Sequence, residues 1–257
     1  KKYGDYTAVA VEDLHIPSGE SFGLVGNNGA GKTTLFRCLI DLIEPDTGFA
    51  MIDGKSTQES EQWKHDTGSY LDENFLVGHL LPEEYFDFIA SINGIRETDL
   101  KARLQSFEPL FNDEILGGKK LIRDLSKGNQ KKVGIAAALL ADIKVLVLDE
   151  PFANLDPSTQ IRLKELLKQL KHDRGVTMLI SSHDLSHVTD VCERIVLLEK
   201  GKLIRDIRTS ADTLRDLEAY FAQVGNGIGQ EEAIKAKSSI RPAMPMCTMH
   251  PPIMCRW

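Results

Sequence analysis

Apolar residues form short continuous runs in some segments of the chain and recur at helical spacing in others. The run from Ser21 to Val25 is followed by a glycine-rich turn, and apolar residues then recur at helical spacing between residues 35 and 43. This order predicts a strand, a loop and a helix. Residues 48–53 and 68–71 carry the next two short runs, which we interpret as further strands.

Between about residues 73 and 140 the pattern is helical throughout. Pro82 stands at the start of a stretch with apolar residues at helical spacing, further helical patterns follow, and no run has the character of a strand. We therefore expect a helical insertion over residues 73–140.

Strand patterns return after residue 140 and alternate with helical ones, which predicts a mainly parallel sheet. Asp156 before Pro157 is typical of a helix start, because the carboxylate caps free N–H groups and proline suits the first turn. A hairpin is expected around Lys200 and Gly201. The expected strands cover residues 145–148, 176–180 and 195–198, and the expected helices cover residues 157–170, 185–191 and 210–221.

Composition indicates a folded chain with one main domain. The 257 residues are 42% hydrophobic and 27% charged, which is enough apolar material for a sizeable core. We expect a single domain over residues 1–222, with a core formed by 1–72 and 141–222. Residues 223–257 are rich in glycine, proline and methionine and are predicted to be a poorly ordered tail.

The sequence predicts a cytoplasmic chain without a membrane segment. No apolar stretch approaches the roughly 18 to 20 residues that span a bilayer, and no charged leader with an apolar segment opens the chain. Lys1 in place of methionine indicates a trimmed N-terminus. The four cysteines show no close paired spacing, so disulfides are not expected. A net charge of −7 argues against a nucleic-acid partner, which a basic face would bind.

The turn after the first of these strands matches a phosphate-binding loop at every fixed position and lies between a predicted strand and helix. Its glycines allow a tight turn that points backbone N–H groups at phosphates. Lys32 would reach the β and γ phosphates of ATP, and the Thr33 hydroxyl would bind Mg²⁺. A glycine-rich turn before a core helix is the simpler alternative, which this context disfavours. The expected nucleotide-binding residues are Gly26, Asn27, Asn28, Gly29, Ala30, Gly31, Lys32, Thr33 and Thr34.

Two adjacent carboxylates follow the buried strand predicted at residues 145–148. Ligands of open α/β sheets bind at the carboxyl ends of parallel strands, so Asp149 and Glu150 are expected near the phosphate loop. Asp149 would hold Mg²⁺, and Glu150 would polarise the attacking water as the catalytic base. A strand that ends in solvated acids is the alternative, and the phosphate loop earlier in the chain makes it less favoured.

The segment 125–130 resembles the signature motif of ATP-binding cassette (ABC) ATPases and precedes the strand that ends in two carboxylates, as in that family. Lys127 and Asn129 depart from the commonest pattern. Ser126 and Gly128 remain, and the resemblance implies that they reach the γ phosphate across a dimer. It also implies an α/β fold with a phosphate-loop NTPase core, a mainly parallel sheet, a small antiparallel β region and a helical insertion.

Other positions agree with this resemblance. Residues 154–156 resemble the D-loop of the family, which implies that Asp156 contacts nucleotide, and His183 resembles the catalytic switch histidine near the γ phosphate. Tyr3 matches the aromatic residue that stacks on adenine, and Tyr6 is the reserve candidate.

The largest departure from the family lies in the loop that joins the core to the helical insertion. Alignment on Gly68 places Asp72, followed by Glu73, where the family usually has glutamine. Either carboxylate would bind Mg²⁺ at least as well as an amide, because hard cations favour charged oxygen. We assign the contact to Asp72 and keep Glu73 as the alternative.

The resemblance implies an ATPase subunit that dimerises around ATP and Mg²⁺, as a homodimer or heterodimer, and drives a separate membrane permease from the inner face of the cell membrane. The Leu-Ser-Lys-Gly form of the signature resembles that of ABC-2 exporters, which favours export over import. The alternative is a non-transport ABC ATPase with a soluble partner such as an iron–sulfur assembly scaffold. A single cassette without heptad repeats argues against ribosomal and DNA-repair relatives.

The resemblance does not cover the chain beyond residue 222. Cys247, His250 and Cys255 stand there among methionines, and such soft ligands suit copper(I) or zinc. Their spacing matches no standard site, so an incidental tail is favoured over metal binding.

Overall fold

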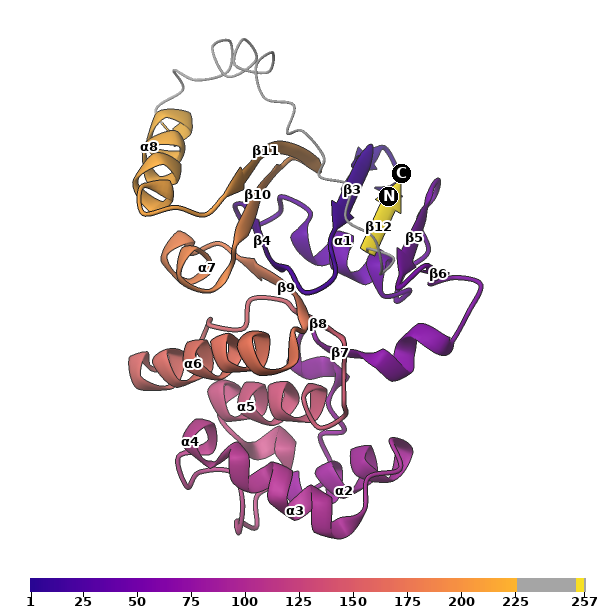
Figure 1. The fold of residues 1–257 in the computed structure, drawn as a ribbon, viewed down its shortest axis with the longest axis vertical. Helices are drawn as coiled ribbons and strands as arrows, with labels where there is room; N and C mark the ends of the chain where they lie inside the picture. The colour runs from indigo at the N-terminus through magenta and orange to yellow at the C-terminus, as the bar shows by residue number, and fades with distance from the viewer. Residues whose placement is uncertain (226–252, 257) are drawn as a thin grey trace.

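The computed structural model of the chain describes residues 1–225 and 253–256. A six-stranded sheet lies at its centre, and a smaller antiparallel sheet and a group of helices lie toward opposite ends of the molecule (Figure 1). The chain begins with a hairpin of β1 (Lys2–Tyr3) and β2 (Tyr6–Thr7). This is the α/β arrangement that the sequence predicts.

The strands of the large sheet run in the order β11-β10-β4-β9-β8-β7, and every neighbouring pair is parallel except β10 with β11. The hairpin predicted around Lys200 joins these two. All strands expected in this sheet are present, with ends that differ by no more than two residues. Their bounds are β4 Ser21–Val25, β7 Thr67–Tyr70, β8 Val145–Leu148, β9 Thr177–Ser182, β10 Arg194–Glu199 and β11 Lys202–Arg208.

Helices and the smaller sheet cover both faces of the large sheet. The covering helices are α1 Lys32–Leu39, α6 Pro157–Arg174, α7 Leu185–Val191 and α8 Thr213–Gly225. Alternate strand residues face two separate apolar cores: Leu146 and Leu148 pack with α6 and α7, whereas Val145 and Val147 pack with α1. Burial on both faces explains why these strands appear in the sequence as continuous apolar runs.

Every element between β7 and β8 is helical, as the sequence predicts. The elements are η2 Glu73–Phe75, α2 Pro82–Ile92, α3 Glu97–Ser106, α4 Glu108–Phe111, η3 Ile122–Asp124 and α5 Lys127–Ala138. Glycines bring α5 against β7: a Cβ on Gly134 would lie 2.3 Å from the Tyr70 ring, and one on Gly68 would lie 2.0 Å from the Ala138 oxygen. Because neither position has room for a side chain, α5 packs directly on the sheet edge.

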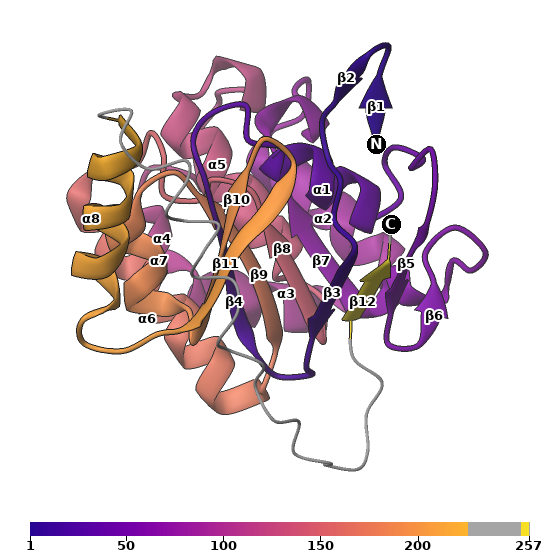
Figure 2. The same ribbon diagram turned by 90° about the horizontal axis from the view of Figure 1, so that it is seen from above.

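The smaller sheet has the strand order β3-β12-β5-β6, and its neighbouring strands are all antiparallel. The bounds are β3 Asp13–Ile16, β5 Phe49–Ile52, β6 Lys55–Ser56 and β12 Ile253–Arg256, and the short helix η1 Gln62–Asp66 follows β6. Figure 2 shows that β12, from the far end of the chain, lies between β3 and β5. β12 therefore supplies backbone partners to both of these strands.

The end of α8 and strand β12 lie in the segment that the sequence predicted to be a poorly ordered tail, so that prediction is wrong for these residues. Residues 223–225 continue α8 and 253–256 form a strand, whereas the composition predicted a poorly ordered segment from residue 223. Ile253 provides the physical reason, because it is only 3% exposed in the core beneath the smaller sheet while its backbone pairs with β3. Cys247 and His250 lie outside the described residues.

No helix within the described residues is long and apolar enough to cross a bilayer. The two cysteines of residues 1–225, Cys38 and Cys192, are buried free thiols. Burial raises the pKa of Cys38 to about 11 and also raises the pKa of Cys192, so both thiols stay protonated at neutral pH.

Replacing Ile253 with alanine should destabilise the fold by about 2 to 4 kcal/mol, the usual cost of truncating a buried isoleucine. Met254, the next residue of β12, is only partly buried, so Met254→Ala should cost clearly less. Urea unfolding of the two variants measures the difference. If both variants unfold at the wild-type midpoint, β12 does not contribute to the folded state in solution.

Candidate active site

The loop from Gly26 to Gly31 joins the buried strand β4 to α1. Gly29 and Gly31 have positive φ angles of 81° and 109°, which other residues rarely adopt. A Cβ on Gly26 would lie 2.3 Å from the Leu198 oxygen, so the loop also packs against β10. No side chain caps α1, and its first N–H groups are therefore available to an anion.

Lys32 is folded back onto this loop. Its Nζ donates to the Gly26 carbonyl at 2.6 Å and lies 3.2 Å from Oε1 of Glu150, and the residue is only 6% exposed. The Glu150 side chain is 24% exposed, so water screens this ion pair only in part. The predicted phosphate-binding cation thus lies beside the predicted catalytic base.

Asp149 is buried at the end of β8, between two hydroxyl groups. Thr33 donates to Oδ2 at 2.5 Å, and Ser181 at the end of β9 donates to Oδ1. Burial raises the pKa of Asp149, and the two hydroxyl hydrogen bonds act in the opposite direction. The Asp149 carboxylate and the Thr33 hydroxyl together offer the oxygen ligands that Mg²⁺ prefers, so these residues fit the predicted cation.

Glu150 lies where several contacts meet. Its φ of 47° is in the left-handed region, and its N–H donates to the Ser181 hydroxyl at 3.0 Å. Oε1 of Glu150 faces Lys32, while Oε2 lies 2.8 Å from Nδ1 of His183. Three residues predicted from separate motifs are therefore in contact, and backbone strain of this kind is common at functional sites.

Ser181 belongs to this cluster, but the sequence did not identify it as a site residue. A hydroxyl at the end of a buried strand was the available signal. Its position depends on the neighbouring strand, because β9 pairs with β8 and places Ile180 opposite Leu148. Ser181 therefore stands beside Asp149, a relation that the sequence alone does not provide.

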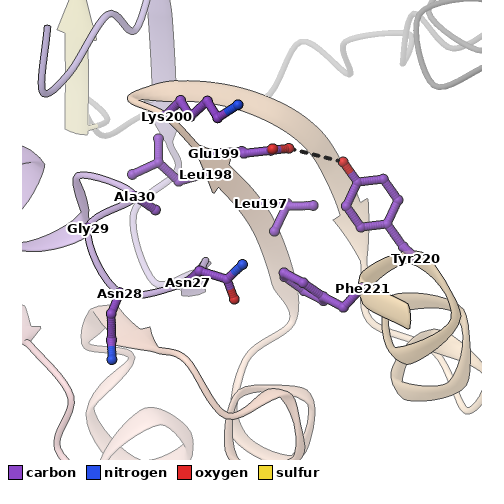
Figure 3. A pocket seen from close by; sticks show the side chains of 10 residues that line it. All are labelled: Asn27, Asn28, Gly29, Ala30, Leu197, Leu198, Glu199, Lys200, Tyr220 and Phe221. Atoms are coloured by element: carbon purple, nitrogen blue, oxygen red, sulfur yellow. Dashed lines mark hydrogen bonds between the residues drawn. The ribbon is translucent and has the colours of Figure 1, made fainter. Parts of the chain in front are cut away.

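Asn27 and Asn28 line a hollow of about 210 Å³ on one side of the phosphate loop (Figure 3). The other walls are the end of β10 and residues Tyr220 and Phe221 of α8, and the Tyr220 hydroxyl donates to Glu199 at 3.3 Å. None of the lining residues belongs to the cluster around Glu150. The hollow is thus a neighbour of the active-site cluster and not its centre.

Ser126 and Gly128 lie at the start of α5 and line a second hollow. Ser126 caps α5 by accepting a hydrogen bond from the Asn129 N–H at 3.2 Å. A Cβ on Gly128 would lie 2.9 Å from the Asn154 oxygen, so the passing loop requires glycine here. The residues that line this second hollow include none of the phosphate loop, and the contact of Ser126 and Gly128 with nucleotide stays a prediction.

Asp156 caps α6, as the sequence predicts. It accepts a hydrogen bond from the Thr159 N–H at 3.0 Å. The hydroxyls of Ser158 and Thr159 also donate to it, and these bonds lower the pKa of Asp156. Asp156 lines the same hollow as Ser126, and its contact with nucleotide stays a prediction.

Asp72 does not join Thr33 and Asp149 in this structure. One of its oxygens caps η2 by accepting from the Asn74 N–H at 2.7 Å, and the other pairs with Arg37 at 3.0 Å. Both oxygens are thus engaged by protein donors. The predicted magnesium contact would require Arg37 to be displaced, and the sequence did not reveal this competitor.

Glu73, the alternative ligand, pairs with Lys127 of the signature segment. The hydrogen bond from Lys127 lowers the pKa of Glu73. Two departures from the common family pattern, one in the connecting loop and one in the signature, are therefore partners in one ion pair.

Tyr3 and Tyr6 face each other across the hairpin of β1 and β2. Tyr3 is 52% exposed, and the Lys1 Nζ lies 5.7 Å from its ring centroid. The hydroxyl of Tyr6 donates to the Gly29 oxygen at 3.3 Å, which connects it to the phosphate loop. Tyr6 is 57% exposed, so both rings are accessible for stacking, and the choice between the two stays a prediction.

A sequence profile of the family described as ABC transporter matches residues 11–153, which include the phosphate loop and both carboxylates. The chain belongs to the ABC transporter family. It is 37% identical over 202 residues to YhaQ of Bacillus subtilis, an uncharacterised ABC transporter ATP-binding protein, and this match covers 79% of this chain and 66% of YhaQ. It is 34% identical over 205 residues to the probable sulfate/thiosulfate import ATP-binding protein CysA of Chlorella vulgaris, with 80% and 86% covered.

Solved structures agree with this assignment. The structure of an ATP-binding subunit of an ABC transporter superposes with a TM-score of 0.73 at 26% identity, covering 91% of this chain and 94% of the other. The resemblance found in the sequence is thus confirmed: the chain is an ATP-binding cassette of this family. It spans 66% of the length of YhaQ.

Replacing Ser181 with alanine removes one of the two hydroxyl hydrogen bonds that favour ionised Asp149. The pKa of Asp149, already raised by burial, should rise further. Because Mg²⁺ binds the ionised carboxylate, activity should be lost at a higher pH on acidification than in the wild type. ATPase assays across the acidic range measure this acidic limb of the pH–activity profile.

The neighbouring serine gives a matched control. Ser182 is equally buried, but its hydroxyl accepts from the Asp184 N–H, so Ser182→Ala should leave the acidic limb in place. An unshifted limb in Ser181→Ala would show that this hydroxyl does not govern the ionisation of Asp149.

Proposed function

We propose that this chain binds ATP on the loop 26–34 and hydrolyses it with Glu150 as the base that orients the attacking water. The contact of one carboxylate with both Lys32 and His183 carries this proposal. Phosphoryl transfer depends mainly on positioning and charge stabilisation, and these three side chains provide a cation, a base and a second polar group.

Binding of ATP changes the partners of Lys32. In the structure its ammonium group donates to the Gly26 carbonyl and pairs with Glu150. A triphosphate carries several negative charges and attracts Lys32 more strongly than a single carboxylate does. Glu150, released from that ion pair and held by His183, can then accept a hydrogen bond from water in line with the γ phosphate.

Thr33 and Asp149 would hold Mg²⁺, which when bound neutralises charge on the β and γ phosphates. The hydrogen bond from Thr33 to Asp149 holds these two side chains next to each other. Ser181 keeps the other oxygen of Asp149 in place. The chain thus has a preformed oxygen site whose position does not depend on Asp72.

Each complete site requires two chains. Ser126 and Gly128 line a hollow that contains no residue of the phosphate loop, which supports a site that the signature of a second chain completes. A two-fold dimer of cassettes, identical or related, would pair the phosphate loop of each with the signature of the other. ATP then lies between the chains and holds them together.

The dimer would act on a separate membrane permease at the inner face of the membrane. The family assignment supports this role, and the Leu-Ser-Lys-Gly form of the signature, which resembles that of ABC-2 exporters, supports export. The permease would select the transported substrate.

Glu150→Gln should keep ATP binding and lose most turnover, because the amide preserves the shape of the side chain without its basicity. We expect turnover to fall by a factor of about 100 or more. Fluorescent-nucleotide titration and phosphate release measure the two steps separately. Near-normal hydrolysis would contradict the assignment of Glu150 and would make His183 the next candidate.

Mixing two inactive variants tests the composite site. Lys32→Ala removes the phosphate contact and Ser126→Arg blocks the space for the γ phosphate, so each alone should be inactive. A mixed dimer retains one intact site, and an equal mixture should recover about a quarter of wild-type turnover if one site suffices. No recovery, in a mixture shown by cross-linking to contain mixed dimers, would contradict the composite site.

A further inference from the structure

Lys131 is a buried lysine that the proposed reaction does not yet use. It lies in α5, one helical turn beyond Lys127, and only 6% of it is exposed. Its Nζ donates to the main-chain carbonyl of Glu150 at 2.6 Å. A buried ammonium is costly unless it is hydrogen-bonded. This ammonium donates its hydrogen bond to the residue assigned as the base.

The surroundings of Lys131 favour a charged donor at this point. Burial lowers the pKa of Lys131, while the negative charges of Glu73, Glu150 and Asp149 raise it. Three acidic groups therefore stabilise the ammonium. An apolar residue would fill the same space but would leave the Glu150 carbonyl with only the longer hydrogen bond from the Ala153 N–H, at 3.3 Å.

The backbone of Glu150 needs support on both sides. Its φ of 47° is unfavourable for a residue with a side chain. On one side the Glu150 N–H donates to Ser181 from the sheet. On the other side the carbonyl accepts from Lys131, which comes from the helical insertion. The two contacts orient the peptide groups on either side of the Glu150 Cα, and so set the direction of its carboxylate.

We propose that Lys131 is a positioning residue for ATP hydrolysis: from the signature helix α5, it holds the Glu150 main chain so that the carboxylate points to the attacking water. This inference rests on the proposed role of Glu150. It differs from a purely structural role, in which a buried lysine would stabilise the packing of α5 and affect catalysis only through the fold.

The adjacent lysine is a matched control for that structural role. Lys132 lies in the same helix, is 2% exposed, and pairs with Glu114 at 2.9 Å inside the helical insertion. It makes no hydrogen bond or ion pair with Glu150, although it lines the hollow beside Ser126. Lys131→Met and Lys132→Met therefore remove equally buried charges, one beside the base and one away from it.

The experiment compares both variants in the full chain by thermal unfolding, fluorescent-nucleotide affinity and steady-state turnover. Lys131→Met should lower kcat by about 10- to 100-fold, as expected for a group that orients a reactive one, with nucleotide affinity little changed. Lys131→Arg, which keeps a charged donor, should recover part of the loss. Lys132→Met should lower kcat clearly less than Lys131→Met does, even if its melting temperature falls.

A double variant separates positioning from stability. If Lys131 acts through Glu150, then Lys131→Met should add little further loss in a Glu150→Gln background, because the group it positions is already inactive. Equal losses in both backgrounds, or equal losses of kcat in Lys131→Met and Lys132→Met, would overturn the proposal. If Lys131→Met fails to fold, Lys131→Gln replaces it in both backgrounds, with the same criteria.

The outcome for Glu150→Gln alone separates the proposed role of Glu150 from the proposed role of Lys131. Full activity in that variant would refute the proposed base. Loss of activity there, together with wild-type kcat in Lys131→Met, would refute only the positioning role of Lys131.

Discussion

The placement of Glu150 is the constraint on which the rest of the structure depends. Its carboxylate is shared by Lys32 from the loop after β4 and His183 from the loop after β9, and its carbonyl accepts from Lys131 in α5. These contacts exist only because the sheet order places the ends of β4, β9 and β8 side by side. They also require α5 to pack directly on β7, which the glycines at that interface permit.

The fold and the phosphate loop could be predicted because their signals are local in the sequence. A buried strand, a glycine-rich turn and a helix follow one another within a short segment, and the backbone shape of Gly29 and Gly31 accounts for those glycines. The same holds for Asp156 before Pro157, which caps α6 as expected. Asp149 and Glu150 were found because ligands of open α/β sheets bind at the carboxyl ends of parallel strands, and the phosphate loop earlier in the chain favoured such a site.

The remaining features depend on residues far apart in the chain. The sequence could not show whether Asp72 binds Mg²⁺, because Arg37 competes for its oxygen. It could not assign a role to Lys131 either, because that role follows from the contact with Glu150. Strand β12 is the extreme case, because four residues in a segment with the composition of a tail pair with β3 and β5. Neither periodicity nor motif spacing carries that information.

The central claim is that ATP takes Lys32 away from Glu150 while the Glu150 main chain stays where it is. A crystal structure of the wild-type chain with Mg²⁺ and a non-hydrolysable ATP analogue tests this most directly. We expect the Lys32 Nζ to lie on the β and γ phosphates, beyond hydrogen-bond distance of Glu150, whose carbonyl still accepts from Lys131. A nucleotide-bound structure in which Lys32 remains paired with Glu150 would contradict it.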